Sequence, residues 1–160
     1  MAIKVAADEL ARLKHLAGLV QKEREHLEAT TQRLFAQHWT AQDLPSLVQD
    51  IDFSERVDAF VARFGRLQDL LGDKLLPAWL KAMQEPPAPV LDNLNKAEKF
   101  GLLPNADQWL ALRRLRNQLV HEYLQNEDEL FDALQAARAG VPVLSQVAVA
   151  LAQKVEAICA

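Results

Sequence analysis

Apolar residues recur at steps of three and four along almost the whole chain, and this spacing constrains the fold more than any other feature of the sequence. The stripe of the first segment consists of Leu10, Leu13, Ala17, Val20, Leu27, Thr31 and Leu34. No segment alternates apolar and polar residues as a strand on a half-buried sheet would. The spacing therefore predicts a chain built only of helices, each burying one face.

The N-terminal half is expected to hold two long helices. The first runs from about Val5 to Gln37, and residues 38–53 form a connector that can hold one short helical turn. Ser54 is a plausible N-cap for the second helix. Pro77 is expected to kink this helix or to begin a new segment, because proline lacks the N–H and its ring clashes with the preceding turn.

The second half begins after the proline-rich break at residues 85–89. A short helix then ends at Gly101, and Asn105 caps a longer one. Asn126, with an acidic residue three positions later, predicts a capping box for the next helix. Gly140 and Pro142 are expected to separate that helix from a final one ending near Ile158.

Together these segments predict one domain over residues 1–160, an antiparallel helical bundle with a four-helix core and with kinked and extra helices. Half of the 160 residues are apolar, which excludes a wholly disordered chain. The aromatic residues at helical spacing are expected in the core. They are Phe60, Phe64, Trp79, Trp109 and Phe131.

Charge and cysteine content favour a cytoplasmic protein without a membrane segment. The net charge is −4, but Lys and Arg outnumber Asp and Glu between Arg63 and His121, so a local basic surface remains possible. The single cysteine, Cys159, suits a reducing compartment. No signal peptide is visible at the N-terminus, and the longest apolar stretch, Gly140–Ala152, is too short to span a bilayer.

Most familiar site motifs are missing from the sequence. There is no glycine-rich phosphate loop, no Cys-X-X-Cys pair and no nucleophile elbow. His15 and His26 lie nearly on one helix face, but two histidines without a third ligand are weak evidence for zinc, and we expect both to be solvated. No metal or cofactor site is predicted.

The exception is the segment Ala111–Tyr123, which places Arg116, Asn117, His121 and Tyr123 within eight residues. Asn117 and His121 are four apart and stack on one helix face, whereas Arg116 lies about 140° around the helix from His121. One straight helix therefore keeps Arg and His apart. A second, antiparallel copy could bring the Arg of one chain beside the His of the other, which predicts a homodimer with a composite cleft.

The sequence Arg116-Asn-Gln-Leu-Val-His121-Glu-Tyr123 resembles the Arg-X4-His-X-Tyr signature of the HEPN domain superfamily. Further segments resemble HEPN proteins encoded beside minimal nucleotidyltransferases. They are Arg63-Phe-Gly-Arg-Leu-Gln-Asp, Gly72-Asp-Lys-Leu-Leu-Pro77, Leu91-Asp-Asn-Leu-Asn-Lys-Ala-Glu-Lys-Phe-Gly101 and Asp107-Gln-Trp-Leu110. The resemblance covers about residues 53–125. The first helix and the tail after Gly140 lie outside it.

This resemblance implies a HEPN-like fold and a metal-independent endoribonuclease that acts as the toxin of a toxin–antitoxin pair. By position, Arg116 and His121 would be the catalytic pair of a homodimer, and Asn117 would support the site. The nucleotidyltransferase antitoxin would attach AMP to Tyr123 and so block the cleft. Arg113 and Arg114 could hold the RNA backbone through phosphate contacts. RNA would be selected over DNA by its 2′-OH.

Two other hypotheses remain open at this point. The chain can be a non-catalytic subunit that binds a nucleotide or substrate for a minimal nucleotidyltransferase, since an acidic tail also suits a protein-binding surface. It can also be a purely structural helical dimer in which the motif supplies polar interface residues.

Overall fold

Every regular element in the described part of the computed structural model is a helix, as the apolar spacing predicts. The structure describes residues 4–122 and 126–159, and of residues 121 and 122 it describes the backbone only. The elements are α1 (Ala7–Leu34), α2 (Leu44–Leu47), α3 (Ile51–Asp69), the π-helical segment η1 (Leu70–Leu75), α4 (Leu76–Ala82), α5 (Val90–Lys99), α6 (Ala106–Glu122) and α7 (Glu127–Cys159).

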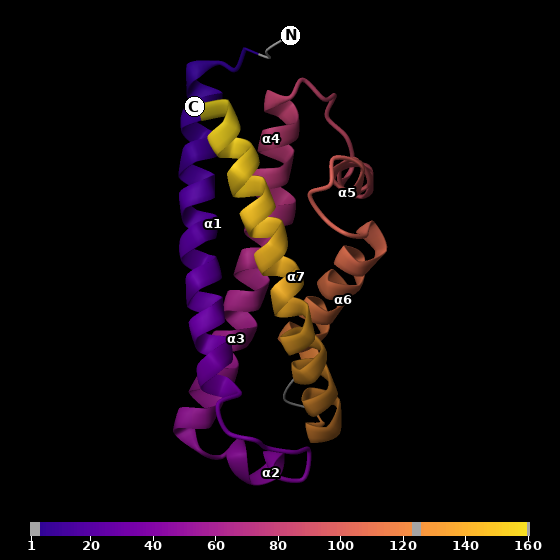
Figure 1. Ribbon diagram of the computed structural model, residues 1–160. Coiled ribbons are helices and arrows are strands. Elements are labelled where there is room, and N and C mark those ends of the chain that lie inside the picture. Colours follow the sequence, from indigo (N-terminus) through magenta and orange to yellow (C-terminus); the bar gives the residue numbers. More distant parts are fainter. Residues whose placement is uncertain (1–3, 123–125, 160) are drawn as a thin grey trace.

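Four long helical rods form an elongated antiparallel bundle (Figure 1). The rods are α1, the continuous run α3–η1–α4, α6 and α7, and α1 begins at the end of the bundle where α7 stops. The short α2 closes the opposite end, and α5 lies outside the bundle between α4 and α6. The predicted bundle with a four-helix core and additional helices is therefore confirmed.

The core is made of leucine, valine and aromatic side chains from all four rods. Phe60, Phe64, Trp79 and Trp109 are buried, and Phe131 is partly buried against the core, so the aromatic residues lie where the sequence predicts. Trp39 joins this core at the α2 end, where its indole N–H donates to the carbonyl of Leu34 at 3.1 Å.

Side-chain caps fix where three of the helices begin. Asn105 accepts a hydrogen bond from the N–H of Gln108 at 3.0 Å, and Asn126 accepts one from the N–H of Asp128 at 2.9 Å, as predicted. The prediction of Ser54 as an N-cap is wrong. Asp50 caps α3 instead, by accepting from the N–H of Phe53, because a helix that begins at Ile51 places Phe53 on the buried face.

Pro77 lies in the first turn of a new helical segment, α4, which begins at Leu76, and this confirms one of the two predicted outcomes. The chain widens into the π-helical turn η1 just before it and continues as α4. A π-turn shifts the hydrogen-bond register by one residue, which accommodates the missing N–H of a proline near the start of the next helical segment. Gly72 lies in this turn, against the indole of Trp109.

The predicted break at Gly140 and Pro142 is also wrong, because α7 runs without interruption for 33 residues. Gly140 is buried, and a Cβ built there would lie 2.5 Å from Leu112 Cδ2, so this glycine serves close packing of α7 on α6. Pro142 faces solvent, where its ring displaces no packed neighbour. Packing along the whole helix outweighs the local proline penalty.

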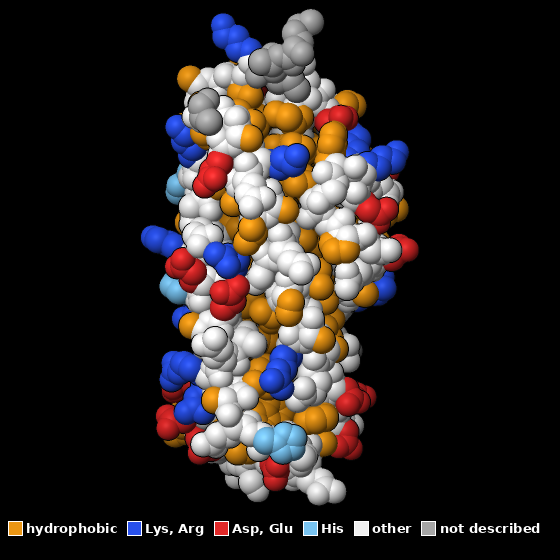
Figure 2. Space-filling view, viewed as in Figure 1, with side chains coloured by type: hydrophobic (Ala, Val, Ile, Leu, Met, Phe, Trp, Pro, Cys, Tyr) orange, Lys and Arg blue, Asp and Glu red, His pale blue; other side chains and the backbone are white. Residues whose placement is uncertain are grey.

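Because α7 is continuous, it is longer than the apolar stretch Gly140–Ala152 that the sequence analysis compared with the thickness of a bilayer. Among the described residues, α7 is the single helix whose length and composition would let it cross a bilayer, a test that core helices of soluble proteins also pass. In this fold α7 packs along α1, α3 and α6. On the face shown in Figure 2, apolar side chains lie in narrow strips between helices, and charged side chains stand mostly along the two edges.

The glycine in the π-turn gives a test of this packing. Gly72→Ala is expected to lower the free energy of unfolding by about 1–2 kcal/mol, because the new methyl group would lie 3.1 Å from Nε1 of the buried Trp109 ring. Gly18→Ala, in α1, meets no atom within 4 Å and is expected to raise it by about 0.5–1 kcal/mol through helix propensity. Urea unfolding of both variants measures the difference, and equal effects would contradict it.

Pro142 offers a second test, of the continuity of α7. Pro142→Ala restores an N–H for the carbonyl of Arg138 and removes little packing, since the ring is exposed. The free energy of unfolding is expected to rise by about 1–3 kcal/mol, measured by denaturant titration. A loss of stability in this variant would mean that the helix is interrupted at the proline.

Candidate functional site

The candidate site lies on α6, which is fixed at its first turn before the motif begins. Glu98 of α5 accepts a hydrogen bond from the N–H of Ala106 at 2.8 Å, and Asn105 caps the same turn. Trp109 and Leu112 then pack into the core. The helix that carries the motif is therefore held in place by the bundle over its first two turns.

Arg116 lies at the seam between α6 and α3. Its Nη2 contacts Oδ2 of Asp69, the last residue of α3, at 3.0 Å, and its Nη1 donates to Oδ1 of the neighbouring Asn117 at 3.1 Å. The side chain remains 32% exposed. A guanidinium has five N–H donors, so donors remain on Nη1 and Nη2 for a further acceptor.

The aliphatic part of Arg116 lies directly against the backbone of α3 at Gly65. A Cβ built on this glycine would lie 3.0 Å from Arg116 Nε and 3.3 Å from its Cγ. The Nε is buried and has no hydrogen-bond partner within the part of the chain that the structure describes. The absence of a side chain at Gly65 thus lets the arginine lie flat on α3 and directs its guanidinium toward Asp69.

The ion pair orients the arginine more than it stabilises the fold. Both side chains are about a third or more exposed, and exposed pairs of this kind contribute roughly 0.2–1 kcal/mol because water and salt screen them. The arginine side chain has several rotatable bonds, and a partner on another helix restrains them. The main consequence of the ion pair is therefore a defined direction for a partly exposed cation.

The other predicted site residues are described to different extents. Asn117 is exposed and contacts Arg116, which agrees with the position expected for a supporting residue, and its role in a reaction stays a prediction. The backbone of His121 lies in the last turn of α6, while its side chain and the whole of Tyr123 fall outside the described residues. The pairing of Arg116 with His121 therefore stays a prediction.

Arg113 and Arg114 lie one turn before Arg116 on α6. Arg114 is exposed and Arg113 is half-buried. Neither forms a hydrogen bond or ion pair with any group in residues 4–122 and 126–159. Both cations are therefore available to an external anion, and their contact with RNA stays a prediction.

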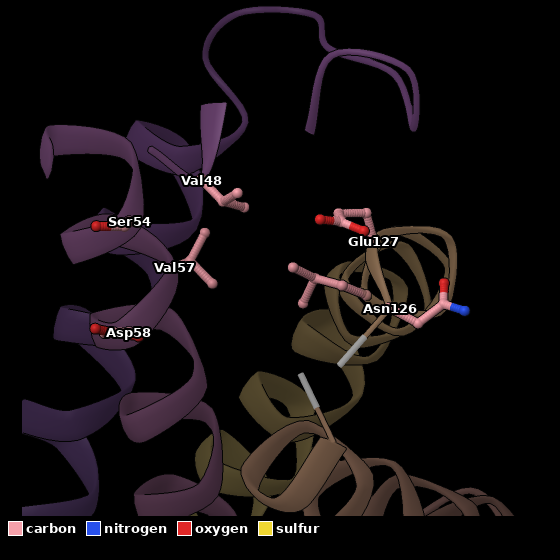
Figure 3. A pocket seen from close by; sticks show the side chains of 7 residues that line it. Val48, Ser54, Val57, Asp58, Asn126 and Glu127 are labelled. Carbon is pink, nitrogen blue, oxygen red and sulfur yellow. The ribbon is translucent and has the colours of Figure 1, made fainter. Parts of the chain in front are cut away.

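A separate hollow of about 280 Å³ lies between α3 and the start of α7 (Figure 3). It is lined by Val48, Ser54, Val57, Asp58, Asn126, Glu127 and Leu130, and neither Arg116 nor Asn117 belongs to this lining. Among the described residues no group of three or more His, Cys, Asp or Glu side chains is arranged to hold a metal ion. His15 and His26 are exposed on α1, as expected.

Two residues of the site were not assigned a role from the sequence. Asp69 is 47 positions from Arg116, and no local pattern indicates that they meet. The role of Gly65 could have been predicted from the spacing of the glycines. Gly65 and Gly72 are seven residues apart and so share one face of an uninterrupted helix. Two glycines on one face indicate that another helix approaches closely there.

Gly65 gives a direct test of how the arginine is positioned. In Gly65→Ala the new methyl group is expected to push the Arg116 side chain away by a few tenths of an ångström and to lengthen its 3.0 Å contact with Asp69. Helix propensity offsets part of the strain, so the free energy of unfolding should change by less than about 1 kcal/mol. A crystal structure of the variant measures the displacement, and an unchanged Arg116–Asp69 contact would contradict this account.

Comparison of the chain with models of known protein families, with curated proteins and with solved structures found no match in any of the three.

Proposed function

We propose that this chain is a metal-independent endoribonuclease of the HEPN type that acts as the toxin of a toxin–antitoxin pair, with Arg116 and His121 as its catalytic residues. The proposal starts from the resemblance of Arg116–Tyr123 to the Arg-X4-His-X-Tyr signature. The structural observation that supports it is the set of contacts made by Arg116 and the exposure of its side chain. This arginine contacts Asp69 and Asn117, its side chain is 32% exposed, and N–H donors remain on its Nη atoms for a phosphate.

The chemistry follows from these two residue types. A free imidazole titrates near pH 6.5, so His121 can take the proton of a ribose 2′-OH as that oxygen attacks the adjacent phosphorus, or give a proton to the departing 5′-oxygen. The products are a 2′,3′-cyclic phosphate and a 5′-hydroxyl. Arg116 would stabilise the negative charge that builds on the phosphate oxygens in the transition state.

The homodimer belongs to the same proposal. Helix geometry separates the directions of positions 116 and 121 by about 140° on one α6, so a cleft that contains both groups is best formed by two copies. The exposed face of α6 carries Arg114, Asn117 and Val120 and is open for such an antiparallel contact. Arg113 and Arg114 would then flank the cleft and hold RNA phosphates.

Tyr123 would supply the means of inhibition. A nucleotidyltransferase antitoxin would transfer AMP from ATP to its hydroxyl and release pyrophosphate. The product would carry added bulk and negative charge beside the position that the substrate phosphate takes. Like-charge repulsion and steric exclusion would both reduce RNA binding.

A second candidate is a non-catalytic subunit that binds a nucleotide or substrate for a minimal nucleotidyltransferase. It is favoured by the exposed acidic residues Glu127, Asp128 and Glu129, which open α7 directly after the motif segment. Three carboxylates on one helical turn would repel RNA and attract a basic protein surface. In this function Arg116 would bind a phosphate without catalysing its transfer.

The test uses purified full-length protein and a labelled RNA in EDTA. Wild type is expected to cut the RNA and leave 2′,3′-cyclic phosphate ends, and a strand with 2′-deoxy residues should stay intact. Arg116→Ala and His121→Ala are each expected to lower the cleavage rate about 10²–10³-fold, with unchanged circular dichroism. His15→Ala, an exposed histidine on α1, is the matched control and should cut at the wild-type rate.

Intact RNA with wild-type protein would contradict the endoribonuclease proposal. If the same protein formed a stable complex with a nucleotidyltransferase and bound nucleotide through Arg116, the second candidate would replace it. If neither cleavage nor nucleotide binding occurred, the remaining hypothesis would be a structural helical dimer in which the motif supplies polar interface residues.

A further inference from the structure

Asp69 is the one acidic side chain that contacts Arg116 from another helix among the described residues. It is the last residue of α3, immediately before the π-turn η1, and it is 46% exposed. π-turns within α-helices occur frequently at functional sites. The turn follows the point where α3 meets the motif arginine.

We propose that Asp69 is a positioning residue that holds the Arg116 guanidinium in the orientation required for a substrate phosphate. The inference rests on the proposed ribonuclease function. Three contacts restrain the arginine, and each acts on a different part of the side chain. Gly65 receives the stem, Asn117 binds Nη1, and Asp69 binds Nη2.

Of these three residues, only Asp69 restrains the guanidinium relative to the core of the bundle. Asn117 is next to Arg116 on the same helix and is exposed, so it can move together with the arginine. Gly65 limits only the stem. Asp69 comes from a separate helix of the core bundle, and it fixes the end of the guanidinium relative to that core.

These contacts leave unused N–H donors at the Nη1 and Nη2 edge of the cation. Nη1 and Nη2 each use one N–H for their contacts, so one N–H on each nitrogen remains for phosphate oxygens. A guanidinium presents such pairs of donors in a plane that matches two phosphate oxygens. Displacement of reacting groups by about 1 Å can lower a rate about 10²-fold, so the orientation of this edge matters for catalysis.

The charge of Asp69 has the opposite effect on binding. A carboxylate beside Arg116 lowers the local positive potential and repels an approaching phosphate. A neutral side chain at this position should therefore bind RNA as well as wild type or better, while it cuts RNA more slowly. A purely structural residue would not separate the two quantities in this way.

The chain contains a matched control for the ion pair. Arg66 and Glu23 form a pair at 3.3 Å between α3 and α1, also partly exposed, and among the described residues no hydrogen bond or ion pair joins Glu23 to the motif. Glu23→Gln and Asp69→Asn both remove one charge from an ion pair of α3. Each is expected to lower the melting temperature by less than about 4 °C.

The experiment measures cleavage and binding for wild type, Asp69→Asn, Asp69→Glu and Glu23→Gln, with 2′-O-methyl RNA as the uncleavable ligand. Asp69→Asn is expected to lower kcat about 10- to 100-fold with an unchanged or lower Kd. Asp69→Glu should recover part of kcat, because it restores the charge one methylene farther out. Glu23→Gln should retain kcat within about two-fold.

A kcat of Asp69→Asn within about two-fold of wild type would overturn the positioning role and leave the ribonuclease function intact. A parallel fall of kcat and RNA affinity, with no recovery in Asp69→Glu, would also overturn it, as would an equal loss in Glu23→Gln. Failure of the proposed function is recognised separately, because wild type itself would then leave RNA uncut.

Discussion

The close contact between α3 and α6 is the constraint on which the candidate site depends. Two glycines on one face of α3–η1 let large side chains of α6 lie against helix backbone, Trp109 at Gly72 and Arg116 at Gly65. Trp109 is buried and anchors the contact, while Arg116 emerges at its edge. The same seam that packs the core therefore also sets where the motif arginine points.

A long-range ion pair completes this arrangement and contributes little to stability. The contact of Arg116 with Asp69 is too exposed to contribute much to folding. It restrains a flexible cation that would otherwise sample several rotamers in water. A site built in this way has its orientation determined by the bundle core and its donors left open to solvent, which is the arrangement required for binding a phosphate.

Much of the fold could be predicted from the sequence because helical spacing and caps are local signals. The all-helical bundle, the proline-rich break and the caps at Asn105 and Asn126 depend on residues a few positions apart. The error at Gly140 and Pro142 occurred because distant packing outweighs local preference there. Gly140 was expected to end a helix, but it receives Leu112 of α6, and α7 continues through Pro142.

The candidate site was predictable only in part for the same reason. Arg116 and Asn117 were found from the motif, whereas Asp69 and Gly65 meet Arg116 only after α3 and α6 are packed together. The proposed contribution of a second copy to the cleft depends on a surface that helix periodicity can suggest but cannot position.

The most direct test of the central claim is a crystal structure of the protein bound to 2′-O-methyl RNA. We expect a phosphate with two oxygens within about 3 Å of Nη1 and Nη2 of Arg116, while Asp69 keeps its contact with the same guanidinium. A phosphate bound elsewhere on the molecule, with Arg116 still covered by Asp69 and Asn117, would contradict it.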